Sequence, residues 1–153
     1  MPDSRTVLVV EDSTLDASLI LAALRTLSEP CPVALVPSGE AAVDYLHRRG
    51  VFAGRADEDP SVVLLDVVLP AMSGFDVLTE IRNDAQLAHM PVVMVATSDH
   101  PSDVARSYAL HANAYVIKPR TFDAFVSLIG DVGHFWSEVN VLPRAGCGTR
   151  NAE

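Results

Sequence analysis

The sequence predicts an α/β protein in which one doubly wound parallel sheet of five strands carries helices on both faces. Two observations lead to this fold class. Short apolar runs rich in branched residues recur along the chain, and a segment with the apolar spacing of a helix follows each run. Alternating strands and helices with short connections form right-handed crossovers, which make the strands parallel.

Five apolar runs are the candidate strands, and prolines mark the beginnings of several. Pro32, Pro60 and Pro91 precede the second, third and fourth runs. The predicted strands are Val7–Val10, Val33–Val36, Val62–Leu65, Val92–Ala96 and Tyr115–Ile117. In a doubly wound sheet the first, third, fourth and fifth strands are neighbours, so we expect the order 2-1-3-4-5.

The segments between the strands repeat apolar residues at helical spacing. The residues that carry this spacing are Leu15, Leu19, Ala23 and Leu27 in the first helix, Ala42 and Leu46 in the second, Val77, Leu78 and Ile81 in the third, Val104 and Tyr108 in the fourth, and Phe122, Phe125, Val126, Ile129 and Trp136 in the fifth. Residues 50–60 form a longer connection, which we expect to be a surface loop that either contacts a partner or is a tolerated insertion.

Composition and charge limit the classes of function. The 153 residues fit one domain, and the formal net charge of −9 without a Lys/Arg cluster argues against nucleic-acid binding. No apolar run is long enough to span a bilayer and no signal peptide is recognisable, so we expect no membrane segment and a cytoplasmic location. Cys31 and Cys147 lie far apart and fit free thiols rather than a zinc site.

Two adjacent carboxylates, Glu11 and Asp12, follow the first predicted strand. Such a pair is unfavourable, because each charge raises the pKa of the other unless a cation or hydrogen-bond donors offset the repulsion. One interpretation is that Asp12 or Ser13 caps the following helix. The other interpretation is a metal site, and the pair alone does not decide between them.

Polar residues also stand at the ends of three other predicted strands. Asp66 ends the third strand, Thr97 the fourth and Lys118 the fifth. Each has an ordinary explanation, since Asp66 fits the start of a turn, Thr97 fits a strand and Lys118 fits a solvated strand end. The carboxyl ends of neighbouring parallel strands, however, meet at one edge of the sheet, where ligands bind. Together these residue types match phosphoryl transfer to a carboxylate.

The chemistry assigns a role to each of these side chains. Asp12, Asp66 and a backbone carbonyl would hold Mg²⁺, which prefers hard oxygen ligands. Glu11 would reach the metal through a bound water. Asp66, kept ionised by the cation, would act as the nucleophile and form an aspartyl-phosphate. Lys118 would bond one phosphoryl oxygen and Thr97 would donate its hydroxyl to another.

This set of residues resembles the response-regulator receiver domain of two-component signalling, over residues 5 to about 136. Glu11 and Asp12 fit the acidic pair of that family, although the pair is Glu-Asp instead of Asp-Asp, and Asp66 fits its phosphoacceptor. Pro70 and Gly74 follow Asp66 at the spacing of the family's phosphorylation loop. The resemblance implies the flavodoxin-like (βα)5 fold and a Mg²⁺ cofactor.

The resemblance also implies a switch. Thr97 would move toward the phosphoryl group, and Tyr115 would turn inward and change the face formed by the fourth helix, fifth strand and fifth helix. Lys118–Pro119 resembles the Lys-Pro pair of the family, whose peptide bond is often cis in relatives. Val68 would supply its backbone carbonyl to the metal, while its branched side chain would obstruct attack by water.

A narrower resemblance is to the stand-alone regulators that serve bacterial phytochromes. It implies a receiver domain at residues 1–136, an arm or tail at residues 137–153, and no output domain. The partners it implies are a sensor histidine kinase, such as a bacteriophytochrome, and a second copy of the chain bound through the fourth helix–fifth helix face and the arm. The apolar residues that lead into the arm and begin it are Phe135, Trp136, Val139, Val141 and Leu142, which either form the dimer or fold back on their own domain.

Three other functions are weighed against a phosphoacceptor that is not an enzyme. A hydrolase of the haloacid-dehalogenase type usually carries a second acid two residues after the nucleophile, and Val68 stands there. A flavodoxin-type carrier needs a phosphate-binding loop after the first strand, but "EDSTLD" is acidic. A receiver that only scaffolds would have no need of the complete set of site residues.

Overall fold

The structure, a computed structural model, describes residues 6–27 and 31–143. Five parallel strands form one sheet in the order β2-β1-β3-β4-β5. They are β1 (Val7–Val10), β2 (Val33–Val36), β3 (Val62–Asp66), β4 (Val92–Ala96) and β5 (Ala114–Ile117). The predicted fold class and strand order are confirmed, and every predicted strand agrees with the observed one to within one residue at either end.

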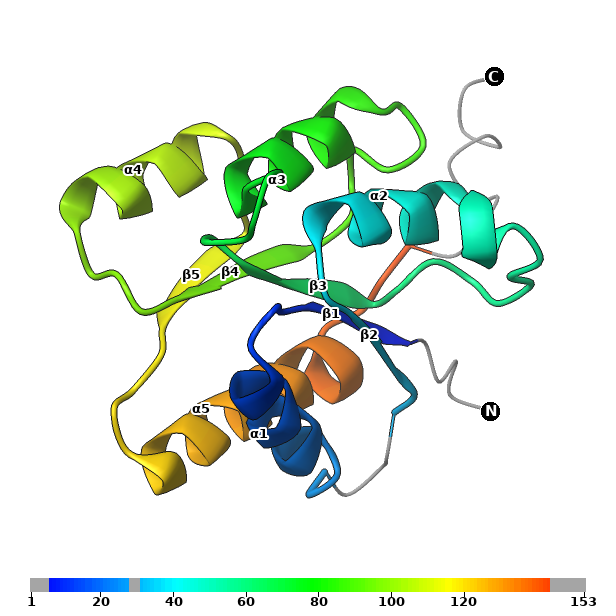
Figure 1. Cartoon of the computed structure of the whole chain (residues 1–153). Helices are drawn as coiled ribbons and strands as arrows, with labels where there is room; N and C mark the ends of the chain where they lie inside the picture. The colour runs from blue at the N-terminus through cyan, green and yellow to red at the C-terminus, as the bar shows by residue number, and fades with distance from the viewer. Residues whose placement is uncertain (1–5, 28–30, 144–153) are drawn as a thin grey trace.

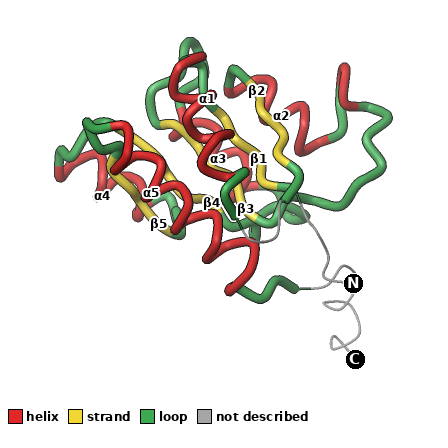
Figure 2. Tube along the Cα trace, turned by 90° about the horizontal axis from the view of Figure 1, so that it is seen from below, coloured by secondary structure: helices red, strands yellow, loops and turns green. Residues whose placement is uncertain are grey.

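Helices connect the strands and cover both faces of the sheet. They are α1 (Thr14–Leu24), α2 (Gly39–His47), α3 (Gly74–Asn83), α4 (Pro101–Ala109) and α5 (Phe122–His134). A Ser or Thr side chain caps α1, α2, α3 and α5 by accepting a bond from a first-turn N–H, and Pro101 begins α4. Figure 1 shows α2, α3 and α4 above the sheet and α1 and α5 below it, and Figure 2 looks onto the face with α1 and α5.

Each face of the sheet has its own apolar core, because alternate residues of a strand point to opposite faces. Val7 and Val9 of β1 belong to the core beside α1 and α5, whereas Leu8 and Val10 belong to the core beside α2 and α3. The strands β1, β3 and β4 are buried throughout. The edge strands β2 and β5 are only partly covered, and Ile117 of β5 is 45% exposed.

The helix faces differ from the predicted ones in three places. In α1 the buried residues are Ala17, Ile20, Ala23 and Leu24. Leu15 is instead 68% exposed, because apolar residues lie on nearly every side of this helix and its spacing does not single out one face. In α4 Ser107 is buried and Tyr108 is 51% exposed, and Phe122 at the start of α5 is 60% exposed.

The 50–60 connection lies on the surface, as predicted, but it is fastened to α2. It begins with a short 3-10 helix, η1 (Gly50–Phe52). The Arg55 guanidinium lies 4.1 Å from the centre of the Tyr45 ring, donates to the Tyr45 carbonyl at 3.2 Å and pairs with Asp57 at 3.2 Å. The charged side chains of the loop are therefore used to fold it back on its own domain.

The segment after α5 continues as a π-helical turn, η2 (Phe135–Val139). Trp136 is half-buried against the core beside α1 and α5, and the Phe135 ring meets it edge-on at 5.0 Å. Phe135, Val139 and Val141 are 45%, 53% and 90% exposed. Trp136 thus folds back on its own domain, whereas the exposed Phe135, Val139 and Val141 leave the dimer interpretation a prediction.

Two expectations from composition can be compared with the described residues. Cys31 carries a free thiol, as expected, while Cys147 lies outside the described residues. Within residues 6–27 and 31–143, no helix has the length and apolar character needed to cross a bilayer.

Candidate functional site

An acidic cluster forms where β1 and β3 end. Glu11 continues the pairing of β1 with β2, because its N–H donates to the Val36 carbonyl at 3.1 Å, and Asp66 is the last residue of β3. One carboxylate oxygen each from Glu11, Asp12 and Asp66 lies within 4.8 Å of the others. Glu11 and Asp66 are 4% and 7% exposed, whereas Asp12 is exposed. The strand ends thus bring the three acids together, as the sequence predicts.

Helix capping does not explain the acidic pair. The residue that caps α1 is Ser13, whose hydroxyl accepts a hydrogen bond from the Asp16 N–H at 3.3 Å. The Ser13 N–H in turn donates to Glu11 Oε1 at 3.0 Å. Since Ser13 takes the capping role, Asp12 is left for the cluster.

Lys118 joins the acids from the end of β5. Its N–H donates to the Ala96 carbonyl at 2.7 Å, which fixes the strand end beside β4. Its Nζ lies 2.8 Å from Glu11 Oε2, 2.9 Å from Asp16 Oδ2 and 3.1 Å from Asp66 Oδ2. An ammonium has three N–H donors, so each carboxylate takes one. Lys118 is 8% exposed, which places this ion-pair network inside the protein.

The network sets two buried carboxylates, those of Glu11 and Asp66, against one buried ammonium. Burial raises the pKa of Glu11 to about 7, with the charge of Asp66 adding to this rise and hydrogen bonds from Lys118 and the Ser13 N–H opposing it. Burial alone would lower the pKa of Lys118, but its hydrogen bonds to Glu11 and Asp16 and the charge of Asp66 raise it above its usual value. One ammonium therefore stays charged among four carboxylates, and hard oxygen ligands of this kind fit Mg²⁺.

The loop after Asp66 packs closely against it. Asp66 Oδ1 accepts a hydrogen bond from the Val68 N–H at 3.1 Å, and the Val68 side chain is 71% exposed. The Gly74 N–H donates to the Val67 carbonyl at 2.9 Å. A Cβ atom on Gly74 would lie 2.1 Å from the Asp66 carbonyl oxygen, so only glycine fits there. Ala71 adopts the left-handed conformation with φ of 63°, a strained geometry that is typical of functional loops.

Thr97 and Tyr115 lie at the same edge of the sheet but do not touch the acids. Thr97 follows β4 and is exposed. The half-buried Tyr115 donates its hydroxyl proton to the Ser98 carbonyl at 2.7 Å, and the Ser98 hydroxyl donates to Asp103 Oδ2 of α4 at 2.7 Å. The residue next to Thr97 therefore connects Tyr115 with α4, which sequence reasoning did not identify.

Two further differences from the predicted site concern Lys118 and Asp16. The described residues contain no cis peptide bond, so the cis form implied for Lys118–Pro119 is wrong for this structure. Asp16 was missed although it binds Lys118. Its signal in the sequence is weak, since an acid in the first turn of a helix is explained by the helix dipole alone.

Comparisons with known proteins agree with this geometry. The response regulator Rcp1 of Synechocystis sp. is 33% identical over 141 residues, which cover 92% of this chain and 95% of Rcp1. A crystal structure of Rcp1 in its Mn²⁺-bound form superimposes with a TM-score of 0.85 at 33% identity, covering 92% of this chain and 99% of Rcp1.

Two further solved structures are regulators named for phytochromes. The phosphorylated cyanobacterial phytochrome response regulator RcpA has a TM-score of 0.85 and 34% identity, over 92% of this chain and 99% of RcpA. The bacteriophytochrome response regulator RtBRR has a TM-score of 0.72 and 42% identity, over 97% of this chain and 87% of RtBRR. The chain is thus similar to the phytochrome-associated regulators, as the narrower resemblance implied. A family model, the response regulator receiver domain, matches residues 7–130, and the chain therefore belongs to this family.

Proposed function

We propose that this protein is a stand-alone response regulator that accepts a phosphoryl group on Asp66 in a Mg²⁺-dependent reaction. The observation that carries the proposal is the contact of Lys118 Nζ with Asp66 Oδ2 at 3.1 Å, beside a cluster in which Glu11 and Asp12 also offer oxygen ligands. A nucleophile, a cation for the phosphoryl oxygens and candidate metal ligands thus meet at one edge of the sheet.

The transfer follows from these groups. An oxygen of the Asp66 carboxylate attacks phosphorus and forms a P–O bond. The P–N bond of a phosphohistidine donor breaks, and its electron pair goes to the imidazole nitrogen. Lys118 donates to a phosphoryl oxygen and Thr97 donates its hydroxyl to another. Asp12, Asp66 and the Val68 carbonyl would hold Mg²⁺, with Glu11 nearby, and the bound ion would neutralise charge during the transfer.

Acetyl phosphate and Mg²⁺ test the reaction without a kinase. Wild-type protein should gain the mass of one phosphoryl group, and Asp66→Asn should gain none, because the amide is not a nucleophile. Asp123→Asn is the matched control, since Asp123 is an exposed acid in the first turn of α5 and should leave uptake unchanged. Wild-type protein that neither gains mass nor binds beryllofluoride would contradict the proposal, because the site would then lack its reaction.

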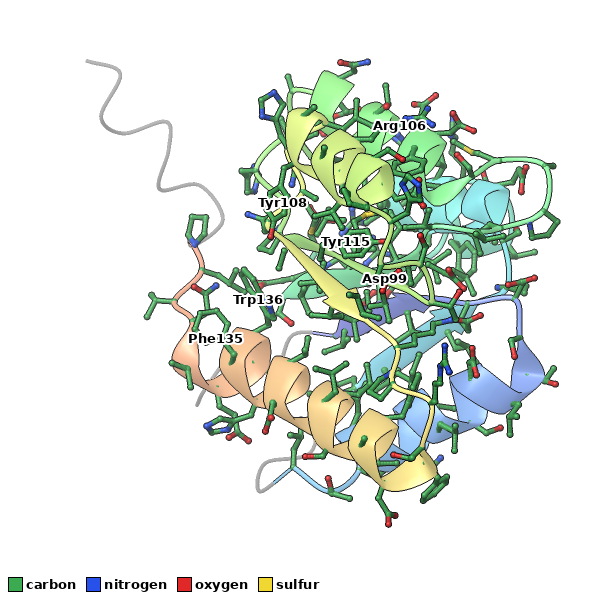
Figure 3. The ribbon with its side chains drawn as sticks, turned by 90° about the vertical axis from the view of Figure 1, so that its left-hand side faces the viewer. Asp99, Arg106, Tyr108, Tyr115, Phe135 and Trp136 are labelled. Atoms are coloured by element: carbon green, nitrogen blue, oxygen red, sulfur yellow. The ribbon has the colours of Figure 1, made fainter. Side chains whose placement is uncertain are left out.

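The switch is proposed to act through the loop after β4. Phosphorylation draws Thr97 toward Asp66, and the Ser98 carbonyl moves with Thr97. This carbonyl accepts the hydrogen bond of the Tyr115 hydroxyl at 2.7 Å, so its movement either breaks that bond or pulls Tyr115 along. The Ser98–Asp103 contact carries the movement to α4. Figure 3 shows Tyr108 and Tyr115 on the face formed by α4, β5 and α5, with Phe135 and Trp136 at the far end of α5.

The proposed kinase partner is a sensor histidine kinase of the bacteriophytochrome type. The names of RcpA and RtBRR support this choice, as both are regulators of phytochrome systems. The protein turns over only its own phosphoryl group and is not an enzyme for other substrates; Val68 also stands where a hydrolase of this chemistry would need an acid. We place it in the cytoplasm, with a receiver domain at residues 1–136 and an arm at residues 137–153.

A second copy of the chain is the proposed partner of the α4, β5 and α5 face. Exposed apolar side chains occur on β5 and after α5, and they are Ile117, Phe135, Val139 and Val141. Val139→Asp should lower the average mass in sedimentation equilibrium, while Val51→Asp, on the 92% exposed Val51 of η1, should not. A wild-type protein that is monomeric at every concentration, phosphorylated or not, would rule the dimer out.

A further inference from the structure

Asp16 is an acid of the site that is neither a proposed metal ligand nor the proposed phosphoacceptor. Among the described residues, the group of carboxylates whose oxygens lie within 4.8 Å consists of Glu11, Asp12 and Asp66 and does not include Asp16. Asp16 nevertheless binds Lys118 Nζ at 2.9 Å, as closely as Glu11 does at 2.8 Å. Its side chain acts on the lysine and not on the metal ligands.

The fold holds Asp16 in a fixed place for this contact. The Ser13 hydroxyl accepts from the Asp16 N–H at 3.3 Å, which sets residue 16 in the first turn of α1. From there its carboxylate meets a lysine 102 positions away in the sequence. The helix dipole explains a first-turn acid, but it does not explain a hydrogen bond to the lysine of the site. Asp123 in the first turn of α5 provides the comparison for the dipole effect.

Two of the three acceptors of Lys118 determine where its third N–H points. The ammonium is a compact group on a flexible stem, and one carboxylate alone leaves it free to rotate. With Glu11 and Asp16 both bound, the remaining N–H is directed at Asp66 Oδ2, 3.1 Å away. Groups that fix a reactive side chain in this way lower the cost of ordering it during the reaction.

We propose that Asp16 is a positioning residue that, together with Glu11, aims the Lys118 ammonium at the phosphoryl group on Asp66. The inference rests on the proposed phosphorylation of Asp66 and deepens it. The side chain of Asp16 is 28% exposed and that of Lys118 is 6% exposed, so Asp16 reaches the lysine from the rim of the site. Asp16 does not touch the phosphoryl group and is not itself a catalytic residue.

The first test compares truncation with a conservative change. Asp16→Ala and Asp16→Ser, whose side chains cannot reach Nζ, should each slow phosphorylation by acetyl phosphate about tenfold. Asp16→Asn should stay within about threefold of wild type, because its amide oxygen still accepts the bond. Mg²⁺ affinity should change little in all three, and Asp123→Ala is the control for loss of a first-turn acid. Faster phosphorylation in the truncated variants, or equal losses in all three, would overturn the inference.

A double-mutant cycle separates positioning from a structural role. In a Lys118→Ala background, Asp16→Ala should cause no further loss of the residual phosphorylation rate, because no ammonium remains to be aimed. A full additional loss in that background would overturn the inference, since Asp16 would then act without the lysine. Phosphorylation of the wild type is measured first, and its absence would contradict the proposed function. If the wild type is phosphorylated but the effects of the two mutations are additive, only the role of Asp16 is contradicted.

Discussion

Arg82 lies at the amino ends of β4 and β5 and Lys118 at the carboxyl end of β5, and these two cations are bound in different ways. At the amino ends, Arg82 donates to the carbonyls of Met90 (2.7 Å), His111 (2.9 Å) and Ala88 (3.1 Å) and to Asn113 Oδ1 (2.9 Å). At the carboxyl end of β5, Lys118 binds carboxylates, with Nζ to oxygen distances of 2.8 to 3.1 Å. One cation has neutral partners and the other has charged partners.

This difference separates a structural contact from a reactive one. The acceptors of Arg82 are neutral oxygens in the turns before β4 and β5, and a planar guanidinium fits several fixed acceptors at once. The acceptors of Lys118 are ionised, one of them is a nucleophile, and an ammonium on a flexible stem can follow an acceptor that changes. The comparison predicts that the amino edge of the sheet governs stability and the carboxyl edge governs chemistry.

The largest expected effect is that of Lys118→Ala on phosphorylation. Uptake from acetyl phosphate should fall about 100-fold, since one charge-stabilising donor is lost, and the phosphoprotein that forms should not change the emission of Trp136. Removing the ammonium also leaves the buried Glu11 and Asp66 carboxylates without their cation, so the protein should be less stable in denaturant without Mg²⁺ and recover when Mg²⁺ is added. A phosphorylation-dependent signal equal to that of wild type would remove the contrast between the edges.

The next effect is that of Arg82→Ala on stability. The free energy of unfolding should fall by about 3 kcal/mol, because the carbonyls of Ala88, Met90 and His111 lose their donor. Arg82→Lys should recover little of this loss, because one ammonium cannot reach all the acceptors that the planar guanidinium binds. Urea denaturation measures both variants, with Arg25→Ala on the exposed Arg25 as the control. The phosphorylation rate of the folded variant should match wild type, and a slower rate would show that the amino edge also serves the site.

The strands and the acidic cluster could be predicted from the sequence because their signals are local. Short runs of branched residues mark the strands, with a proline before β2, β3 and β4, and residues at strand ends share an edge in any parallel sheet. For that reason the sequence predicts that Glu11, Asp12, Asp66 and Lys118 lie together. The face of α1 was predicted wrongly, since a helix that is apolar on most sides has no distinct stripe, and Leu15 turned outward.

The contacts that were missed join residues far apart in the sequence through ordinary residue types. Asp16 is one of several first-turn acids, and its partner Lys118 lies 102 positions away. Ser98 follows Thr97 as an unremarkable loop serine, yet its carbonyl receives the Tyr115 hydroxyl. Side-chain direction decides both contacts, and the pattern of apolar residues carries no information about it.

The smallest expected effect compares two glycines and sharpens the view of the carboxyl edge. Gly74→Ala places a Cβ atom 2.1 Å from the Asp66 carbonyl oxygen, so the backbone at the acceptor must shift, at a cost of about 2 kcal/mol in unfolding free energy. Phosphorylation should slow as well, because Asp66 moves relative to Lys118.

Gly130→Ala is the matched substitution away from the site. Gly130 lies within α5, and a Cβ atom there meets nothing within 4 Å, so alanine should stabilise the protein by about 0.5–1 kcal/mol through its better helix propensity. Thermal unfolding should show a loss of stability in Gly74→Ala and a gain in Gly130→Ala. Acetyl phosphate uptake should slow in Gly74→Ala and stay unchanged in Gly130→Ala. Equal stability changes at the two glycines would mean that the close approach of α3 to Asp66 places no constraint on the site.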